Sequence, residues 1–188
     1  THLSGDIRKL PISRGVPIAK ALADDAMIAW GMNGGNLHPM NGHPLRLAIA
    51  GWPGSVSGKW LTGISIRNKV HDGPKMGGNS YRVPSKPVAP GSEVADSDMK
   101  IIEAMPVKSL ITYPETGLRH SISKPLEVRG HAWVGDRIVD QVHLSADFGQ
   151  HWQEVSLSTP RNAGAWQQFH GSVHFKRVGY HEVWARAT

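Results

Sequence analysis

The chain has 188 residues, which suits one or two domains, and its 39% of hydrophobic residues supports a packed core. It contains no cysteine, which excludes a disulfide scaffold, a thiol nucleophile and a thiolate metal site built from these residues. Its net charge of +6 comes from scattered Lys and Arg. We therefore expect an anionic small molecule or an acidic partner protein rather than nucleic acid.

No apolar run approaches the ~20 residues that a membrane helix needs, so no membrane span is expected. The chain starts at Thr1 without a signal peptide, which we interpret as a mature or trimmed chain.

The first half breaks into short apolar runs separated by glycine and proline, which favours short strands over long helices. We predict one short helix over Ile18–Ala23 and a tight turn at Asn33-Gly34. Strands are predicted over Pro44–Ala50 and Lys59–Ile66, where apolar and polar residues alternate. Residues 67–98 show no period of 2 or 3.6, so we expect a long loop that is functional or a linker.

The second half has a different sequence pattern. From about residue 100, short strand candidates recur with turn signals between them. This regular spacing predicts an all-β sandwich with Trp133 and Trp152 as core anchors, and a domain boundary near residue 98. The strand candidates are Val107–Thr112, Pro125–Gly130, Ala132–Val134, Ile138–Ser145, Trp152–Leu157, Trp166–Val173 and Gly179–Ala187.

Eleven histidines raise the hypothesis of a metal site. His170 and His174 are four residues apart on a predicted strand, which separates them by roughly 13 Å and is too far for one ion. We therefore expect solvated or hydrogen-bonded surface histidines rather than a zinc site held by protein ligands.

Two polar segments carry candidate anion chemistry. Ser57, Gly58 and Lys59 offer backbone N–H groups and one ammonium to an anion, but the same composition fits a tight turn between strands. Tyr81 with Arg82 is either an aromatic anchor for its loop or a phenol beside a guanidinium that suits an oxyanion. The residues alone leave both alternatives open.

Short motifs follow one another along the chain. The first half carries Met32-Asn-Gly-Gly-Asn-Leu, Asn41-Gly-His-Pro-Leu-Arg46, Gly51-Trp-Pro-Gly and Gly58-Lys59-Trp60-Leu61. The second half carries a Val-x-Gly-x-Ala-Trp theme ending at Trp133, and Val142-His-Leu-Ser-Ala-Asp-Phe-Gly-Gln-His-Trp152. In this order, the motifs resemble the molybdopterin oxidoreductases of the sulfite oxidase type over nearly the whole chain.

The resemblance implies a cofactor-binding role for five residues. Arg46 and Lys59 match the basic residues that hold the pterin phosphate and ring system. Ser57 and Gly58 match the backbone stretch beside that lysine. Asn41 stands where many members have His, so its amide is expected to make the cofactor contact. A phosphate dianion is well matched by an arginine and a lysine.

The resemblance also implies the reacting residues. Tyr81 matches the family's active-site tyrosine, which lies near the molybdenum, and we predict it to be catalytic. The family's substrate-binding arginines lie upstream of these residues. Arg82 is predicted to contact the substrate from its position beside Tyr81, because an anionic substrate suits a guanidinium. The family holds its molybdenum through one cysteine thiolate. This chain has none, so we expect that ligand outside these residues and no metal ligand within them.

The fold implied by the resemblance is mainly β with a little α. Residues 1–98 would form the C-terminal part of the cofactor domain, including the long loop 67–98, and residues 99–188 an immunoglobulin-like dimerisation domain. The expected cofactor is molybdenum–molybdopterin. No haem is expected, because no Cys-x-x-Cys-His motif is present.

The resemblance further implies a homodimer in the bacterial periplasm. It would oxidise sulfite or a related sulfur compound and pass electrons to a cytochrome c. The alternative is a cofactor-free dimerisation module that has lost the catalytic cysteine segment, which the missing cysteine favours and the retained Arg46, Lys59 and Tyr81 disfavour.

Overall fold

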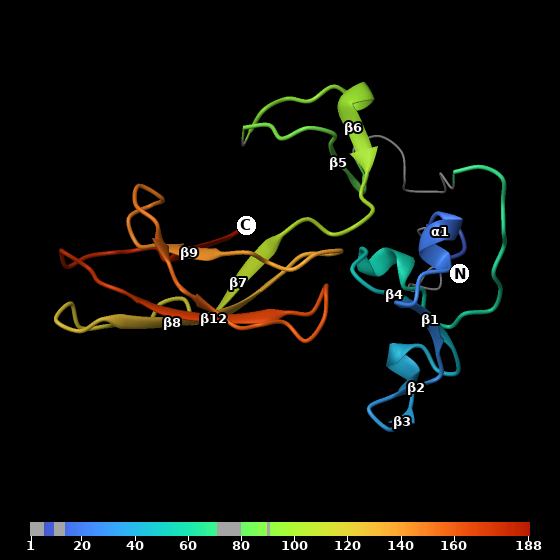
Figure 1. The fold of residues 1–188 in the computed structure, drawn as a ribbon, viewed down its shortest axis with the longest axis horizontal. Coiled ribbons are helices and arrows are strands. Elements are labelled where there is room, and N and C mark those ends of the chain that lie inside the picture. Colours follow the sequence, from blue (N-terminus) through green and yellow to red (C-terminus); the bar gives the residue numbers. More distant parts are fainter. Residues whose placement is uncertain (1–5, 10–13, 71–79, 90) are drawn as a thin grey trace. The chain divides into compact units, whose positions relative to one another are not determined.

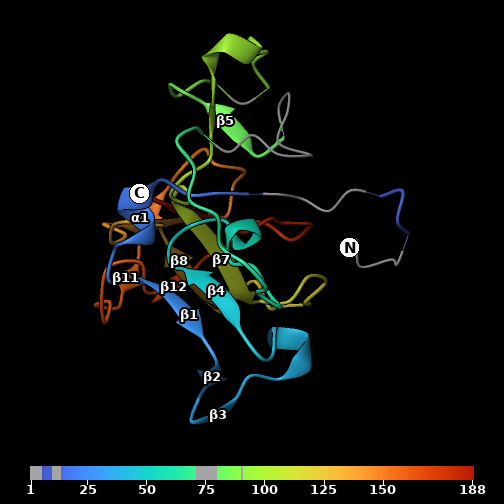
Figure 2. The ribbon, with the colours of Figure 1, turned by 90° about the vertical axis from the view of Figure 1, so that its right-hand side faces the viewer.

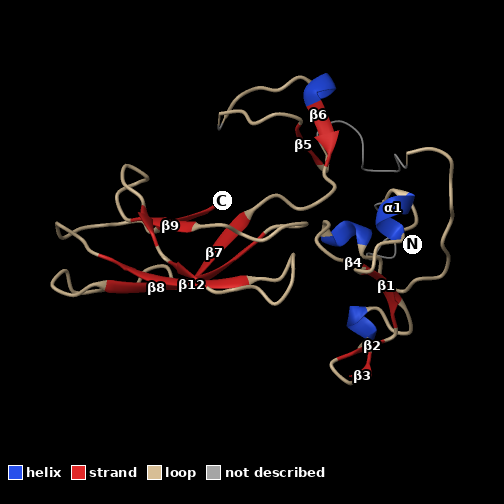
Figure 3. Cartoon of the chain, in the orientation of Figure 1, coloured by secondary structure: helices blue, strands red, loops and turns tan. Residues whose placement is uncertain are grey.

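The computed structural model describes residues 6–9, 14–70, 80–89 and 91–188, and these are mainly strand and loop (Figures 1 and 3). The chain divides into two compact units, Thr1–Glu103 and Ala104–Thr188. Helical structure in the described residues amounts to one turn of α-helix and three 3₁₀ helices, which confirms a mainly β fold with a little α. None of these helices is long and apolar enough to span a membrane.

Unit 1 begins with a short helix and a two-stranded sheet. Helix α1 covers Ile18–Ala21, so the predicted helix is confirmed and ends two residues earlier than expected. Strand β1 (Ala26–Ala29) pairs antiparallel with β4 (Arg46–Ile49), side by side in Figure 2. Strand β4 confirms the strand predicted over Pro44–Ala50 and places Arg46 at its first residue.

A tight hairpin joins β1 to the rest of unit 1. Strands β2 (Gly31–Met32) and β3 (Gly35–Asn36) pair antiparallel. The two residues between them, Asn33 and Gly34, have φ of 53° and 80°. Two consecutive positive φ angles are what a two-residue hairpin turn requires, so the predicted Asn-Gly turn is confirmed.

The strand predicted over Lys59–Ile66 is wrong, because this segment has no regular strand. Trp60 has φ of 53°, and this left-handed residue interrupts the extended backbone. Single backbone hydrogen bonds hold the segment beside β4 instead. The Leu47 N–H donates to Gly58 O (2.8 Å), and the Leu61 N–H donates to Leu45 O (2.8 Å).

The described part of the predicted loop 67–98 contains regular structure. Strand β5 (Arg82–Pro84) pairs antiparallel with β6 (Met99–Ile101), and the 3₁₀ helix η3 (Asp96–Asp98) precedes β6. A three-residue strand is too short for sequence periodicity to reveal. Residues 71–79 and Pro90 of this loop lie outside the described residues.

Unit 2 contains a four-stranded sheet of order β11-β12-β8-β7 and a three-stranded sheet of order β10-β9-β13 (Figure 1). All pairings are antiparallel, and residues from both sheets share one core, which confirms the predicted sandwich. The strands are β7 (Lys108–Tyr113), β8 (Leu126–Trp133), β9 (Val142–Ser145), β10 (Gln153–Glu154), β11 (Ser156–Leu157), β12 (Gln167–Val173) and β13 (Trp184–Ala187).

The core of unit 2 is made by alternate residues of these strands. Val128, Val142, Leu144 and Phe169 are at most 1% exposed. Gln167 is also buried, and its amide is satisfied by main-chain groups, since Oε1 accepts from the Val139 N–H (2.8 Å). A buried amide with its hydrogen bonds made costs little.

The prediction that Trp133 and Trp152 anchor the core is wrong. Trp133 follows the fully buried Ala132 on β8, so the strand alternation turns Trp133 to the other face. There its ring stacks on Trp166 at 4.5 Å between centroids. Trp152 is half-buried, and its ring lies 4.3 Å from the Arg186 guanidinium carbon.

The loop after β9 is organised by one carboxylate. Asp147 Oδ1 accepts from the His151 N–H (3.0 Å) and from Ser145 Oγ (2.9 Å), and Oδ2 lies 2.6 Å from His151 Nδ1. The hydrogen bonds from His151 lower the pKa of Asp147 well below its usual range, with a smaller contribution from Ser145. The charged form of Asp147 therefore stabilises this loop.

Gly130 supplies a first test of the core. A Cβ at this position would lie 2.6 Å from Phe169 Cε1 and closer still to Leu110 O. We expect Gly130→Ala to lower the free energy of unfolding of unit 2 by about 1–3 kcal/mol, because the crowded core must shift. Urea unfolding followed by tryptophan fluorescence measures this change. Glu127→Ala, an exposed position on the same strand, is the control and should change the midpoint little.

Asp147 supplies a second test, through pH. Because its folded-state pKa is depressed, its contribution to stability is present above about pH 4 and is lost as the pH falls further. We expect the unfolding free energy of the wild type to fall more steeply below about pH 4 than that of Asp147→Asn. Parallel slopes for the two proteins in urea titrations would contradict this assignment.

Candidate functional site

A cluster of donors surrounds the 3₁₀ helix η1 (Pro39–Asn41) in unit 1. The carbonyl oxygens of its three residues each accept a hydrogen bond of 3.0 Å from a side chain that lies later in the sequence. The pairs are Trp60 Nε1 to Pro39 O, Lys59 Nζ to Met40 O, and Arg46 Nη1 to Asn41 O. One turn of backbone therefore positions two cations and an indole.

The stretch before Lys59 is attached to the same cluster through β4. Arg46 Nη2 donates to Ser57 O (3.4 Å), and Ser57 Oγ accepts from the Ile49 N–H (3.1 Å). Ser57 directly follows the 3₁₀ helix η2 (Gly54–Val56). Asn41, Arg46, Ser57, Gly58 and Lys59 were predicted from the sequence to bind the cofactor, and the structure brings all five together.

Gly42 makes this close approach possible. Its φ is 112°, and a Cβ there would lie 3.1 Å from both Arg46 Cβ and Lys59 Cβ. The residue is buried between the two cationic side chains. Gly42 lies within the Asn41–Arg46 motif but was not predicted to have a role of its own. The adjacent Asn41 offered a signal, since an Asn-Gly pair marks a position that needs a positive φ.

The cluster around η1 carries positive charge from Arg46 and Lys59. Within the described ranges, Arg46 and Lys59 form no salt bridge with a carboxylate. Arginine has five N–H donors and lysine three, so the carbonyl contacts leave donors on both side chains for a further acceptor. Lys59 Nζ also lies 4.7 Å from the centre of the Trp60 ring. This donor set suits a polyanion such as a phosphate ester.

Tyr81 and Arg82 belong to a different element. Tyr81 directly precedes β5, has φ of 57° and is 40% exposed. Its carbonyl oxygen accepts from the Ile102 N–H (2.9 Å), which closes the end of the β5–β6 hairpin. Arg82 is half-buried and lies opposite Ile101 in that hairpin.

Arg14 connects this hairpin to η2, and it was not predicted from the sequence. Arg14 Nη1 donates to Ser55 Oγ in η2 (3.3 Å), and Nη2 donates to Ile102 O (2.9 Å). Its guanidinium carbon lies 5.3 Å from the centre of the Tyr81 ring. Burial lowers the pKa of Arg14 from its usual value. A single arginine ahead of a glycine carries no periodicity or motif, so the sequence offered no signal for it.

No group of three His, Cys, Asp or Glu residues in the described part of the chain is arranged to hold a metal ion. The sequence contains no cysteine, so these residues supply no thiolate ligand. The cluster around η1 is instead a set of cationic groups and N–H donors, which suits an anionic ligand.

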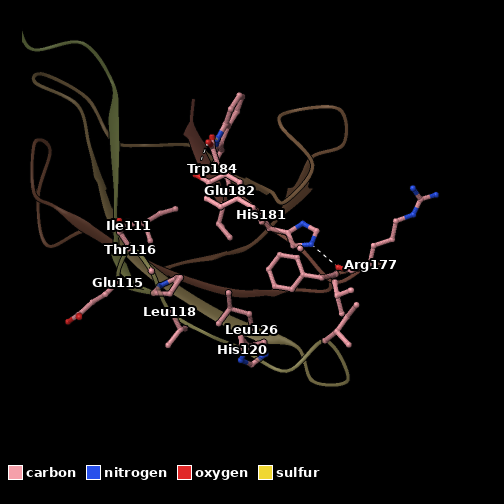
Figure 4. Close-up of a pocket in the computed structure, with 18 residues that line it drawn as sticks. Ile111, Glu115, Thr116, Leu118, His120, Leu126, Arg177, His181, Glu182 and Trp184 are labelled. Atoms are coloured by element: carbon pink, nitrogen blue, oxygen red, sulfur yellow. Dashed lines mark hydrogen bonds between the residues drawn. The ribbon is translucent and has the colours of Figure 1, made fainter.

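A hollow of about 480 Å³ lies in unit 2 and is shown in Figure 4. Ile111, Leu118 and Leu126 give it an apolar side, and the His181 ring N–H donates to Arg177 O (2.8 Å) at another side. None of the site residues predicted from the sequence lines this hollow.

Two family models match the chain. The oxidoreductase molybdopterin binding domain matches residues 2–75, and the Mo-co oxidoreductase dimerisation domain matches residues 99–188. Among curated relatives, the mitochondrial sulfite oxidase of Drosophila melanogaster is 32% identical over 193 residues, covering 95% of this chain and 33% of the relative. The mitochondrial sulfite oxidase of Homo sapiens is 32% identical over 162 residues, covering 81% of this chain and 29% of the relative.

The chain is also similar to a nitrate reductase and to a solved sulfane dehydrogenase. The NADH nitrate reductase of Ulva prolifera is 28% identical over 156 residues, covering 74% of this chain and 17% of the relative. Among solved structures, the sulfane dehydrogenase SoxCD from Paracoccus pantotrophus aligns with a TM-score of 0.68 and 27% identity. That alignment covers 92% of this chain and 42% of the solved chain. The chain thus spans about a third of the length of the sulfite oxidases it matches.

The two matched domains define the class of protein, a molybdopterin oxidoreductase with a dimerisation domain. Together with the sulfite oxidase relatives and the sulfane dehydrogenase structure, they show that the chain belongs to the sulfite oxidase family. The resemblance inferred from the motifs is confirmed.

Gly42 supplies a test of the cluster. We expect Gly42→Ala to displace Arg46 and Lys59 and to lower the free energy of unfolding by about 1–3 kcal/mol, because the new methyl group meets both side chains at a strained φ. Urea unfolding measures the loss of stability. Gly63→Ala is the matched control, since a Cβ there meets nothing within 4 Å. Equal midpoints for the two variants would contradict the role given to Gly42.

Proposed function

We propose that this chain is part of a molybdenum-cofactor oxidoreductase that oxidises sulfite or a related sulfur compound and passes the electrons to a cytochrome c. The observation that carries the proposal is the pair Arg46 and Lys59, held by backbone carbonyls and without a carboxylate partner among the described residues. The names of the relatives, sulfite oxidase and sulfane dehydrogenase, support the choice of substrate class.

In this proposal the cluster around η1 binds the cofactor's phosphate and pterin. Arg46 and Lys59 supply positive charge and N–H donors, and the Ser57–Gly58 backbone lies beside them. The Asn41 side chain supplies an amide at the same place. When bound, the cofactor supplies the oxygen-atom transfer and the redox chemistry. The residues of this chain hold and orient it.

Tyr81 and Arg82 are proposed to act on the substrate. A phenol is a neutral hydrogen-bond donor, so Tyr81 can bind a sulfite oxygen without adding negative charge to the site. Arg82 would add a guanidinium on the same hairpin for the anionic substrate. The half-exposed Tyr81 ring is accessible for such a contact.

We extend the proposal to the assembly and its place in the cell. Unit 2 would form a homodimer, as the description of its matching family model supports. The acceptor would be a separate cytochrome c, and the protein would act in the bacterial periplasm. Cell fractionation with an antibody against the protein tests the location.

A second candidate function is a cofactor-free dimerisation module. The observation that favours it is the absence of cysteine from the sequence, since the family holds molybdenum through a thiolate. The two functions differ in one measurable property, the presence of molybdenum and pterin in the purified protein.

The cofactor assignment is tested with Arg46→Gln and Lys59→Gln. Each substitution removes a charge-assisted contact worth about 1.5–3 kcal/mol, so we expect roughly tenfold or greater loss of cofactor occupancy under limiting cofactor. Elemental analysis for molybdenum and fluorescence of the oxidised pterin measure occupancy. Lys69→Gln, an exposed lysine outside the cluster, is the control and should retain the cofactor.

The outcomes separate the alternatives. Wild-type protein without molybdenum and pterin would support the dimerisation module and overturn the oxidoreductase proposal. Full cofactor content without sulfite-dependent reduction of cytochrome c would keep the oxidoreductase class but point to another substrate or acceptor. Unchanged occupancy in both glutamine variants would overturn the role of the cluster.

A further inference from the structure

We propose that Arg14 is a positioning residue for Tyr81, which it connects to the η2 turn that leads into the phosphate-binding stretch. The proposal deepens the function proposed above and rests on it. It assigns a role to a side chain that no motif in the sequence singled out. We call the set of contacts that Arg14 makes with Ser55, Ile102 and Tyr81 the arginine clamp.

The arginine clamp joins three segments that are far apart in the sequence. Nη1 donates to Ser55 Oγ (3.3 Å), 41 residues away, and Nη2 donates to Ile102 O (2.9 Å), 88 residues away. The guanidinium also lies against the Tyr81 ring, with 5.3 Å from its carbon to the ring centre. One side chain therefore contacts both η2 and the end of the β5–β6 hairpin.

Only an arginine fits this set of partners. Its planar fork directs two separate nitrogens to two acceptors, while its flat face packs on an aromatic ring. A lysine ammonium is a single point charge at the end of a flexible stem and cannot make the three contacts in that geometry. The chemistry of the side chain, and not its length alone, is thus matched to the site.

Packing alone does not explain a charged side chain at position 14. Arg14 Nε is buried and has no hydrogen-bond partner among the described residues. Burial also lowers the pKa of Arg14, which shows that desolvation disfavours the charge. An apolar side chain of similar size would avoid this cost. The guanidinium is therefore better explained by its contacts with Ser55, Ile102 and Tyr81 than by packing.

Tyr81 is the group that most needs to be held. Its φ of 57° is a left-handed conformation, which is strained for a non-glycine residue. Such a conformation persists where its surroundings over-determine it. The Ile102 N–H bonds to Tyr81 O, and Arg14 holds Ile102 O and the Tyr81 ring at once. Loss of Arg14 removes two of these three restraints.

The consequence for the reaction is geometric. The phosphate-binding residues begin two positions after Ser55, so the arginine clamp links the position of the Tyr81 phenol to the place where the cofactor is held. A displacement of about 1 Å of a positioned group costs up to roughly a hundredfold in rate. Arg14 should therefore affect turnover more than it affects cofactor binding.

The experiment uses the full-length protein purified with its cofactor, as wild type, Arg14→Ala, Arg14→Lys, Tyr81→Phe and the double variant Arg14→Ala with Tyr81→Phe. We expect Arg14→Ala to lower kcat for sulfite about 10- to 100-fold with molybdenum content unchanged. We expect Arg14→Lys to recover little. On the Tyr81→Phe background, Arg14→Ala should cost less than about threefold, because the group it positions is gone. Lys86→Ala, an exposed cation on the same segment as Tyr81, is the control.

Two further measurements distinguish positioning from a general loss of structure. Ethylguanidinium added at non-denaturing concentration should restore part of kcat in Arg14→Ala and none in Tyr81→Phe. Hydrogen exchange of the Ile102 amide and of β5 should be faster in Arg14→Ala than in wild type, and unchanged in Lys86→Ala. A melting temperature close to that of the wild type completes the expected result.

Fully additive losses in the double variant, or unchanged hydrogen exchange in the hairpin, would overturn the proposal. Loss of molybdenum from Arg14→Ala would also overturn it, because Arg14 would then act in cofactor binding. The failure of the proposed function is separate, since it shows as an absence of molybdenum and pterin in the wild type. Faster exchange in Arg14→Ala would in that case still support the arginine clamp.

Discussion

The hydrogen bonds that the η1 carbonyls accept are the interactions on which the site depends. A backbone carbonyl attracts a cation without neutralising its charge, whereas a carboxylate would attract the cation and also neutralise its charge. Arg46 and Lys59 are held in place by such carbonyls, so they are ordered and still electropositive. Gly42 contributes to the same arrangement, because the absence of a side chain there lets Arg46 and Lys59 approach the η1 turn. Preorganised charge of this kind needs little rearrangement to receive an anion.

The two units are stabilised in different ways. Unit 2 has a contiguous core shared by two sheets, with residues such as Val128 and Leu144 fully buried. In the described part of unit 1, the buried hydrophobic residues are Leu37, Ile49 and Val56. In that part of unit 1, hydrogen bonds from Arg46, Lys59 and Trp60 to main-chain carbonyls shape the site.

Local chemistry could be predicted from the sequence, and long-range placement could not. The Asn33-Gly34 turn needs two positive φ angles, which its own residues favour, so it was predictable. The five residues around η1 came together as expected because a family pattern connected them. Trp60 adopts a left-handed φ that its residue type does not favour, and this conformation interrupts the strand that was predicted over Lys59–Ile66. Arg14 reaches partners 41 and 88 residues away, a distance over which a single sequence contains no local signal.

The small number of buried hydrophobic residues in the described part of unit 1 has a consequence for the maturation of the protein. A ligand that binds the folded form and not the unfolded chain adds its binding free energy to stability, and the addition matters most where little apolar burial exists. Under the proposed function, the carbonyl acceptors around Arg46 and Lys59 would be joined by the charged oxygens of the cofactor, and cofactor binding would add to the stability of this unit. Chains that fail to load would open locally more often and would be the preferred substrates of proteases. Proteolysis would then remove molecules without cofactor in preference to those that carry it.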